Sequence, residues 1–201
     1  MLDRPILDKT RDLLTKLATA LLDRNITADQ VTVTGFLVGM LAVPLIIFEH
    51  SFIALICIIL NRLLDGLDGT LARLSTPTDR GGFLDIVLDF IFYSAIPLAF
   101  ALANPEANAL AAAVLIYAFI GTGCSFLAFA TIAEKRKISS TQFPDKSFYY
   151  LGGLTEATET IIVFGIMCLI PSYFSLLAYA FAFLCGITTI LRIRHGLSSF
   201  K

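Results

Sequence analysis

The sequence predicts an all-α, polytopic membrane protein, with about six transmembrane helices preceded by an amphipathic helix. Hydrophobic residues make up 57% of the 201 residues, and the mean hydropathy of +0.81 is too high for an ordinary soluble domain. Apolar stretches close to the roughly 20 residues that cross a bilayer recur along the chain. We therefore expect one membrane-embedded domain over residues 1–201, with the transmembrane bundle over residues 31–193.

Residues 1–24 form the first predicted element. Charged residues such as Asp3, Arg4 and Asp8 interrupt any continuous apolar core, which argues against a signal peptide. The apolar residues recur at helical spacing, at Ile6, Leu13, Leu14, Leu17, Leu21 and Leu22. This pattern predicts a helix that lies in the membrane interface and contacts lipid. A soluble helix packed on the loops is the alternative.

Six apolar stretches follow, and each is predicted to span the membrane. Asp29 stands just before the first of them, where we expect it to cap the helix. Gly35 and Gly39 have the small-residue spacing of closely packed helices, which would serve an internal contact or a contact between subunits. The predicted spans are residues 31–48, 51–74, 81–103, 107–132, 155–170 and 172–193.

The distribution of Lys and Arg predicts the orientation. The short links at residues 49–50 and 104–106 and the corner at Pro171 contain neither residue. The basic residues are at the other ends of the spans, at Arg73, Arg80, Lys135, Arg136, Lys137, Lys146, Arg192, Arg194 and Lys201, as well as in residues 1–24. By the positive-inside rule, both termini should face the cytoplasm, in the inner (cytoplasmic) membrane of the cell.

Residues 65–89 carry four carboxylates within predicted spans. Each acidic residue at the centre of a bilayer is unfavourable by roughly 3 kcal/mol, so such a cluster indicates a function. Asp65 and Asp68 share one helix face with Asn61 and Ala72, because the steps between them are four, three and four residues. The remaining two carboxylates, at Asp85 and Asp89, are one turn apart on the next span.

The link over residues 75–80 is short, so the two acidic helices should be antiparallel neighbours whose carboxylates meet. Oxygen ligands without a nearby His or Cys suit a hard cation such as Mg²⁺ or Mn²⁺. Gly66, Gly69, Gly81 and Gly82 leave room where a backbone or a bulky ligand comes close. Arg73, at the mouth, has a guanidinium whose geometry suits phosphate oxygens.

Two other functions remain open for these residues. Asp65 or Asp68 could simply form an ion pair with Arg62 or Arg73, although one such pair leaves the other carboxylates unexplained. A carrier of divalent cations would also contain clustered carboxylates. It does not require the glycines and the arginine in this pattern.

The acidic region resembles the signature of the CDP-alcohol phosphatidyltransferase family. That signature is Asp-x-x-Asp-Gly-x-x-Ala-Arg, then seven residues, then Gly-x-x-x-Asp-x-x-x-Asp. All eight fixed positions are present in one register, as Asp65, Asp68, Gly69, Ala72, Arg73, Gly81, Asp85 and Asp89. The resemblance implies an integral membrane enzyme of phospholipid biosynthesis.

The resemblance also implies roles for single residues. Two divalent cations, Mg²⁺ or Mn²⁺, would be held by Asp65, Asp68, Asp85 and Asp89, and Asp89 would also be the general base. The nucleotide and its diphosphate would lie against Gly69, Ala72, Arg73 and Gly81. Residues 26–32 resemble a segment that often precedes the first span in this family, which makes Thr32 a further candidate for the nucleotide pocket.

The expected reaction is transfer of a phosphatidyl group from CDP-diacylglycerol to a small polar alcohol, with release of CMP. A second reading reverses the lipid, so that CDP-choline or CDP-ethanolamine reacts with diacylglycerol. A non-enzymic cation carrier is the third. The family tends to form homodimers, so we expect a homodimer, and we expect no nucleic-acid partner.

The acceptor pocket is predicted at the start of the fifth span. Glu156 and Glu159 share a face there and would favour a cationic or neutral alcohol over a phosphorylated one. Equally, they could serve only to complement the helix dipole. The preceding polar link, residues 134–153, is a candidate lid, and its Lys146 is a candidate contact for the acceptor, while Arg136 could also reach the site.

Overall fold

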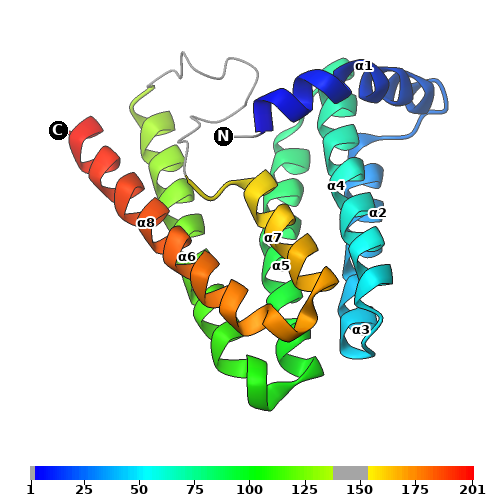
Figure 1. The fold of residues 1–201 in the computed structure, drawn as a ribbon. Helices are drawn as coiled ribbons and strands as arrows, with labels where there is room; N and C mark the ends of the chain where they lie inside the picture. Colours follow the sequence, from blue (N-terminus) through cyan, green and yellow to red (C-terminus); the bar gives the residue numbers. More distant parts are fainter. Residues whose placement is uncertain (1–2, 138–153) are drawn as a thin grey trace.

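The computed structural model describes residues 3–137 and 154–201, and these residues form a bundle of α-helices (Figure 1). The predicted all-α fold class is confirmed. The elements are α1 (Asp3–Leu22), α2 (Ala28–Met40), α3 (Ala42–Ile47), α4 (Ser51–Leu74), α5 (Asp79–Ala103), α6 (Pro105–Lys135), α7 (Ala157–Leu169), the 3₁₀ helix η1 (Pro171–Tyr173) and α8 (Phe174–Ser199).

Four helical segments of the described residues are long and apolar enough to cross a membrane: Ala28–Ile47, Asp79–Ala103, Pro105–Lys135 and Pro171–Ser199. The first combines α2 and α3, which are separated only at Leu41, three residues before Pro44. Proline has no N–H to continue the helical hydrogen bonds, which accounts for the interruption. Of the other two predicted spans, α4 carries the acidic region and α7 has only 13 residues.

The N-terminus of α2 differs from the prediction in its capping residue. Thr27 is the N-cap: its Oγ1 accepts a hydrogen bond from Gln30 N, and its backbone N donates to Gln30 Oε1. The expectation that Asp29 caps this helix is therefore wrong. Asp29 lies inside the first turn, and its carboxylate pairs with Arg80 Nε at 3.3 Å.

Helix α2 packs tightly against α4 through its two glycines. A Cβ atom on Gly35 would lie 2.9 Å from Leu64 Cβ, and one on Gly39 would lie 2.8 Å from Asn61 Cγ. Only glycine allows so close an approach. The small-residue spacing therefore serves a contact inside the chain, one of the two uses that the sequence left open.

Helices α4 and α5 are antiparallel, but they are not among the closely packed helix pairs of the described chain. Instead α2 and α3 contact both of them, while α7 packs on α4 and α6 packs on α5. The prediction of direct neighbours is thus corrected: the two acidic helices face each other across a gap. Four carboxylates repel one another, and a bound ligand needs room, so close packing here would be unfavourable.

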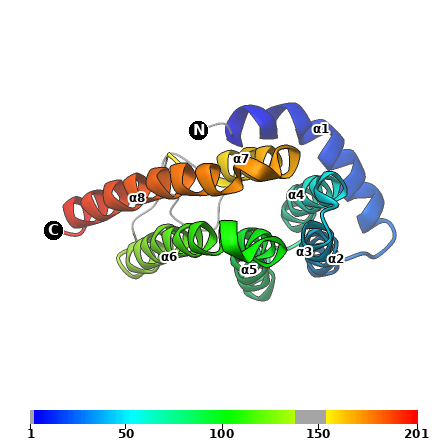
Figure 2. The same ribbon diagram turned by 60° about the horizontal axis from the view of Figure 1, so that its bottom comes forward.

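The rest of the bundle supports this arrangement. Viewed from the end in Figure 2, α8 lies over α6 and α7 lies beside α4. The main core is rich in fully buried aromatic side chains, including the stacked pair Phe100 and Phe174. Many large apolar side chains remain exposed on the outer surface, such as Phe52, Leu110 and Phe183. An outer surface of this kind is typical of contact with lipid.

Helix α1 lies across one end of α4 (Figure 1). Its Leu14 and Ala18 are buried against Leu67 and Leu71, while Leu17 remains 46% exposed. The expected N-terminal helix is therefore present and packs on a transmembrane helix rather than on loops. Figure 1 also places both chain termini at this same end of the bundle.

Candidate metal and nucleotide site

The acidic pocket lies in the gap between α4 and α5, with α2 as its third wall. From α4 come four polar residues, and α5 contributes two carboxylates and one leucine. From α2, Thr32, Gly35 and Phe36 close one side. The lining residues are Thr32, Gly35, Phe36, Asn61, Arg62, Asp65, Asp68, Asp85, Leu88 and Asp89.

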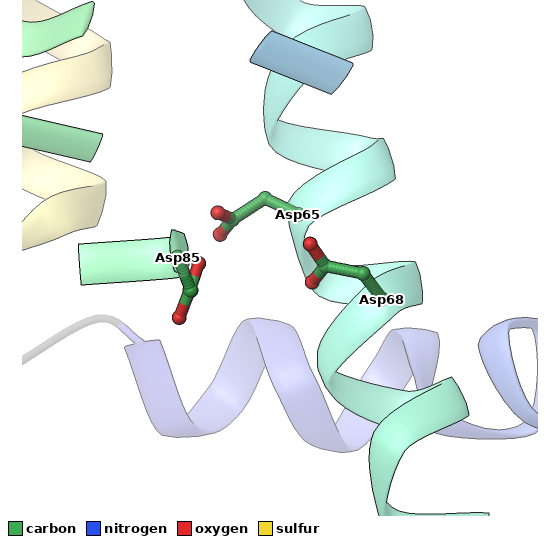
Figure 3. Close-up of side chains that lie close together, drawn as sticks. All are labelled: Asp65, Asp68 and Asp85. Atoms are coloured by element: carbon green, nitrogen blue, oxygen red, sulfur yellow. The ribbon is translucent and has the colours of Figure 1, made fainter. Parts of the chain in front are cut away.

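Three of the predicted metal ligands are brought together in this pocket. Ligand atoms of Asp65, Asp68 and Asp85 all lie within 4.8 Å of one another. Figure 3 shows their carboxylates directed toward a common space, two from α4 and one from α5. The helical spacing predicted this for the first two, and the reversal of the chain after Ser75 adds the third.

The structure also allows a test of whether these residues fit a cation. Asp68 is only 5% exposed, and its Oδ2 atom is buried without a hydrogen-bond partner in the described part of the chain. Burying an unpaired carboxylate oxygen is unfavourable, and a metal ion supplies the missing partner. The cluster contains only oxygen ligands, which suit Mg²⁺ or Mn²⁺. The donor set therefore fits a hard divalent cation.

Asp89, the fourth predicted ligand, lines the pocket but has a different partner. Its Oδ1 accepts a 2.7 Å hydrogen bond from Arg62 Nη2. Arg62 Nη1 lies 3.5 Å from Asp65 Oδ2 as well. An ion pair within the acidic region is thus present, as one alternative reading of the sequence allowed. It leaves Asp68 and Asp85 without this arginine, and so it does not account for the cluster.

The predicted nucleotide residues lie at two levels. Thr32 lines the pocket itself. Arg73 is exposed at the end of α4, where its Nη2 donates to Thr70 Oγ1 at 3.0 Å and its Nη1 lies 3.5 Å from the Cβ position of Gly69. Gly69, Ala72 and Arg73 are therefore outside the acidic pocket, one to two turns nearer the end of the helix.

Gly81 stands at the beginning of α5, where Thr78 is the N-cap and accepts a hydrogen bond from Gly81 N. A Cβ atom at Gly81 would lie 3.1 Å from Asp29 Oδ1. The glycine thus allows α5 to begin beside the first turn of α2. This contact brings residues 29 and 81 together at the mouth of the site, which the sequence did not predict.

The predicted acceptor residues are not brought into the acidic pocket. Glu156 is the N-cap of α7, and its backbone N donates to Glu159 Oε2 at 3.1 Å in a capping box. This agrees with the dipole role that the sequence left open. Lys146 and most of the candidate lid lie outside the described residues. An acceptor role for these side chains stays a prediction.

Sequence reasoning did not assign Gly35, Phe36, Tyr93 or Leu88 to the site. The first two line the pocket because α2 lies against the gap, and Tyr93 is one turn beyond Asp89, where its hydroxyl accepts from Arg62 Nη1 at 3.0 Å. The spacing of Gly35 and Gly39 was a signal of close packing. Its partner helix could not be read from the sequence.

Comparisons with known proteins agree with this geometry. A family model described as CDP-alcohol phosphatidyltransferase matches residues 25–191. The chain is 50% identical to "Inner membrane protein YnjF" of Escherichia coli over 201 residues, which is all of this chain and 98% of that protein. It is 33% identical to "Archaetidylinositol phosphate synthase" of Pyrococcus horikoshii over 95 residues, 47% of this chain and 50% of that one.

Two solved structures share the fold. A crystal structure of the Mycobacterium tuberculosis phosphatidylinositol phosphate synthase PgsA1 with CDP-DAG bound has a TM-score of 0.72 and 20% identity, over 92% of this chain and 94% of that chain. A second structure of the same enzyme, in complex with manganese and citrate, has a TM-score of 0.71 and 20% identity, over 92% and 88%. The helical arrangement is therefore that of a known membrane enzyme.

Proposed function

Because the chain belongs to the CDP-alcohol phosphatidyltransferase family, and is an integral membrane enzyme of that class, we propose that its donor is CDP-diacylglycerol and its acceptor a small polar alcohol. The products would be a phospholipid and CMP. The observation that carries this proposal is the cluster of Asp65, Asp68 and Asp85, with its buried, unpaired oxygen. The CDP-DAG bound in a structure of the same fold supports the choice of donor.

Asp65, Asp68 and Asp85 would hold Mg²⁺ or Mn²⁺, with Asp89 at the edge of the cluster and two ions in total. Manganese in the second structure of the same fold supports this assignment. When bound, the cations would neutralise diphosphate oxygens and stabilise the charge that develops on the leaving CMP.

The remaining roles belong to residues at the mouth and on α2. Arg73 would bind diphosphate oxygens through its guanidinium. Gly69, Ala72 and Gly81 would leave room for the cytidine, and Thr32 would contact it from the side of α2. The site would face the cytoplasm, where a nucleotide-activated substrate is available.

Asp89 would accept the proton of the acceptor hydroxyl as that oxygen attacks the phosphorus. The P–O bond to CMP breaks as the new P–O bond forms, so the electron pair leaves with CMP. Asp89→Asn should lower the turnover number by on the order of a hundredfold or more, and change donor affinity little. CMP release and donor binding, measured on the same preparation, check this. A fully active Asp89→Asn protein would exclude Asp89 as the base.

The acceptor would be a cationic or neutral alcohol, if Glu156 and Glu159 contribute to its pocket. The test is CMP release by the purified, reconstituted protein with CDP-diacylglycerol and Mg²⁺ or Mn²⁺. The acceptor panel is serine, ethanolamine, choline, inositol, glycerol, glycerol 3-phosphate and inositol phosphate. Stimulation by one unphosphorylated alcohol is expected, and stimulation only by a phosphorylated one would refute this choice of acceptor.

The same assay separates the reaction from its alternatives. Release should be lost on chelation and in Asp68→Asn, while the exposed Asp23→Asn serves as a matched control that keeps its activity. A folded protein that is silent across the panel, and then releases CMP from CDP-choline or CDP-ethanolamine with diacylglycerol, would show the reversed donor. Silence with both donors would leave cation transport as the better assignment.

A further inference from the structure

Arg62 is the one guanidinium among the residues that line the acidic pocket, and no role has been assigned to it so far. Its side chain is only 15% exposed. It leaves α4 one turn before Asp65 and reaches across the gap to α5. A buried cation beside predicted ligands of a divalent cation requires an explanation, because it opposes the binding of further positive charge.

The hydrogen bonds of Arg62 hold it in one orientation. Nη2 donates to Asp89 Oδ1 at 2.7 Å, Nη1 donates to Tyr93 OH at 3.0 Å, and Nε donates to Asn61 Oδ1 at 2.8 Å. The guanidinium also lies 5.0 Å from the ring centre of the fully buried Phe92. A planar group with three directed bonds and an aromatic contact has little freedom to move.

The support for Arg62 extends to α2. Asn61 accepts from Arg62 and donates through Nδ2 to Gly35 O at 2.9 Å. Gly39 lies beneath Asn61, with no room for a side chain. The arginine is thus anchored on three helices, through Asn61 on α4, Tyr93 on α5 and, by way of Asn61, the backbone of α2. Such an arrangement fixes the position of whatever the arginine holds.

We propose that Arg62 is a positioning residue that holds the carboxylate of Asp89 apart from the metal-binding cluster formed by Asp65, Asp68 and Asp85. The ligand atoms of that cluster lie together, whereas Asp89 is bound to the arginine. Asp89 is thereby kept as a separate carboxylate facing the pocket, and Arg62 limits the affinity of the cluster for cations. This inference rests on the proposed function for the role of Asp89, but not for the effect on metal binding.

The test combines Mn²⁺ binding without substrates and steady-state kinetics. In Arg62→Gln, a unit of positive charge is lost from the pocket and Asp89 is released toward the cluster. Both changes favour a cation, so the Kd for Mn²⁺, measured by paramagnetic resonance on purified protein, should fall by on the order of tenfold. The turnover number should fall by about a hundredfold, with the KM for CDP-diacylglycerol little changed.

The opposite signs of these two effects distinguish positioning from general damage, since a disrupted site would bind Mn²⁺ more weakly. Arg62→Lys keeps the charge without the planar group, and it should restore the wild-type Mn²⁺ affinity but only part of the turnover. Arg194→Gln, an exposed arginine on α8, is the matched control and should change neither quantity. Unchanged or weaker Mn²⁺ binding in folded Arg62→Gln would overturn the proposal, as would unchanged turnover.

Tyr93→Phe gives a second test if Arg62→Gln does not fold. It removes one hydrogen bond from the guanidinium and leaves every charge in place. Turnover should fall several-fold while the Kd for Mn²⁺ stays within about twofold of wild type, and no change in turnover would count against the positioning role. If wild-type protein releases no CMP, the proposed function fails, and the Mn²⁺ measurements still decide whether Arg62 limits metal binding.

Discussion

Asp68 is the most enclosed of the four carboxylates in the acidic region, and its surroundings explain why the site needs a partner from outside the chain. Its Oδ2 atom is buried without a hydrogen-bond donor among the described residues. Arg62, the nearby cation, is directed at Asp89 and Asp65 instead. The negative charge of Asp68 is therefore left for a bound cation to neutralise.

Arg73 differs from Arg62 in exposure, and this difference predicts a different phenotype. Its guanidinium is held by Thr70, outside the acidic pocket. If it binds the diphosphate, Arg73→Gln should raise the KM for CDP-diacylglycerol by about tenfold, because one charge-assisted contact is lost. Mn²⁺ binding in the absence of the donor should be unchanged.

Steady-state kinetics over a range of donor concentrations would check this prediction, with Arg194→Gln as the exposed control. A wild-type KM in Arg73→Gln would remove Arg73 from the donor site. A change in Mn²⁺ affinity without donor would instead place it in the metal site. Either result would separate it clearly from Arg62.

Among the helices, α2 sets the width of the site. It contacts both acidic helices, and its glycines determine how closely α4 approaches. Without this third element, the short link after α4 would favour direct packing of α4 on α5. Helix α2 therefore contributes to the site mainly through its shape, besides the side chains of Thr32 and Phe36.

Gly39→Ala tests this role. The added Cβ would lie 2.8 Å from Asn61 Cγ and 2.9 Å from Phe92 Cε2, so one of the helices must move. We expect a loss of about 1–3 kcal/mol in the free energy of unfolding, measured in detergent, as for other overpacked interiors. Because Asn61 supports Arg62, CMP release should fall too.

Gly186→Ala on α8 is the matched control, because nothing lies within 4 Å of the Cβ that it adds. There, the higher helix propensity of alanine should leave stability unchanged or raise it by up to about 1 kcal/mol. Equal stability of the two variants would contradict the close contact between α2 and α4.

At the scale of the whole molecule, both termini and the mouth of the site lie at one end of the bundle (Figure 1). Together with the basic residues at that end, this supports a cytoplasmic orientation for all three. The sequence predicted the same topology from an even number of spans. The orientation itself stays a prediction.

Reporter fusions would test the orientation. Alkaline phosphatase is active only outside the cytoplasm, so a fusion after Lys201 should be inactive and a green fluorescent protein fusion there should fluoresce. A truncated fusion after Asn104, in the link between α5 and α6, should show the reverse. An active phosphatase at the C-terminus would invert the proposed orientation and place the site on the other side.

The predicted homodimer is constrained by the packing of α2. Gly35 and Gly39 are buried against α4 inside one chain, so they are not available for a contact between subunits. Any dimer would have to form through the exposed apolar surface. The homodimer therefore stays a prediction, with one of its candidate surfaces excluded.

Much of the fold could be predicted because a bilayer restricts the chain strongly. Backbone groups in lipid must be bonded within helices, so the apolar stretches of suitable length indicated the helices directly. Similarly, the step sizes between Asp65 and Asp68, and between Asp85 and Asp89, placed each pair on one helical face. The cap at Thr27 was missed because two polar residues close in sequence compete for that position.

The sequence by itself determined the helices, the oxygen-only ligand set and the family, because each depends on residue type and local spacing. Only the tertiary structure decided which carboxylates meet and which one pairs with Arg62, since these outcomes depend on distances between helices. The gap between α4 and α5 belongs to the second kind. It exists because α2, which is distant from α5 in the chain, packs against both helices and keeps them apart.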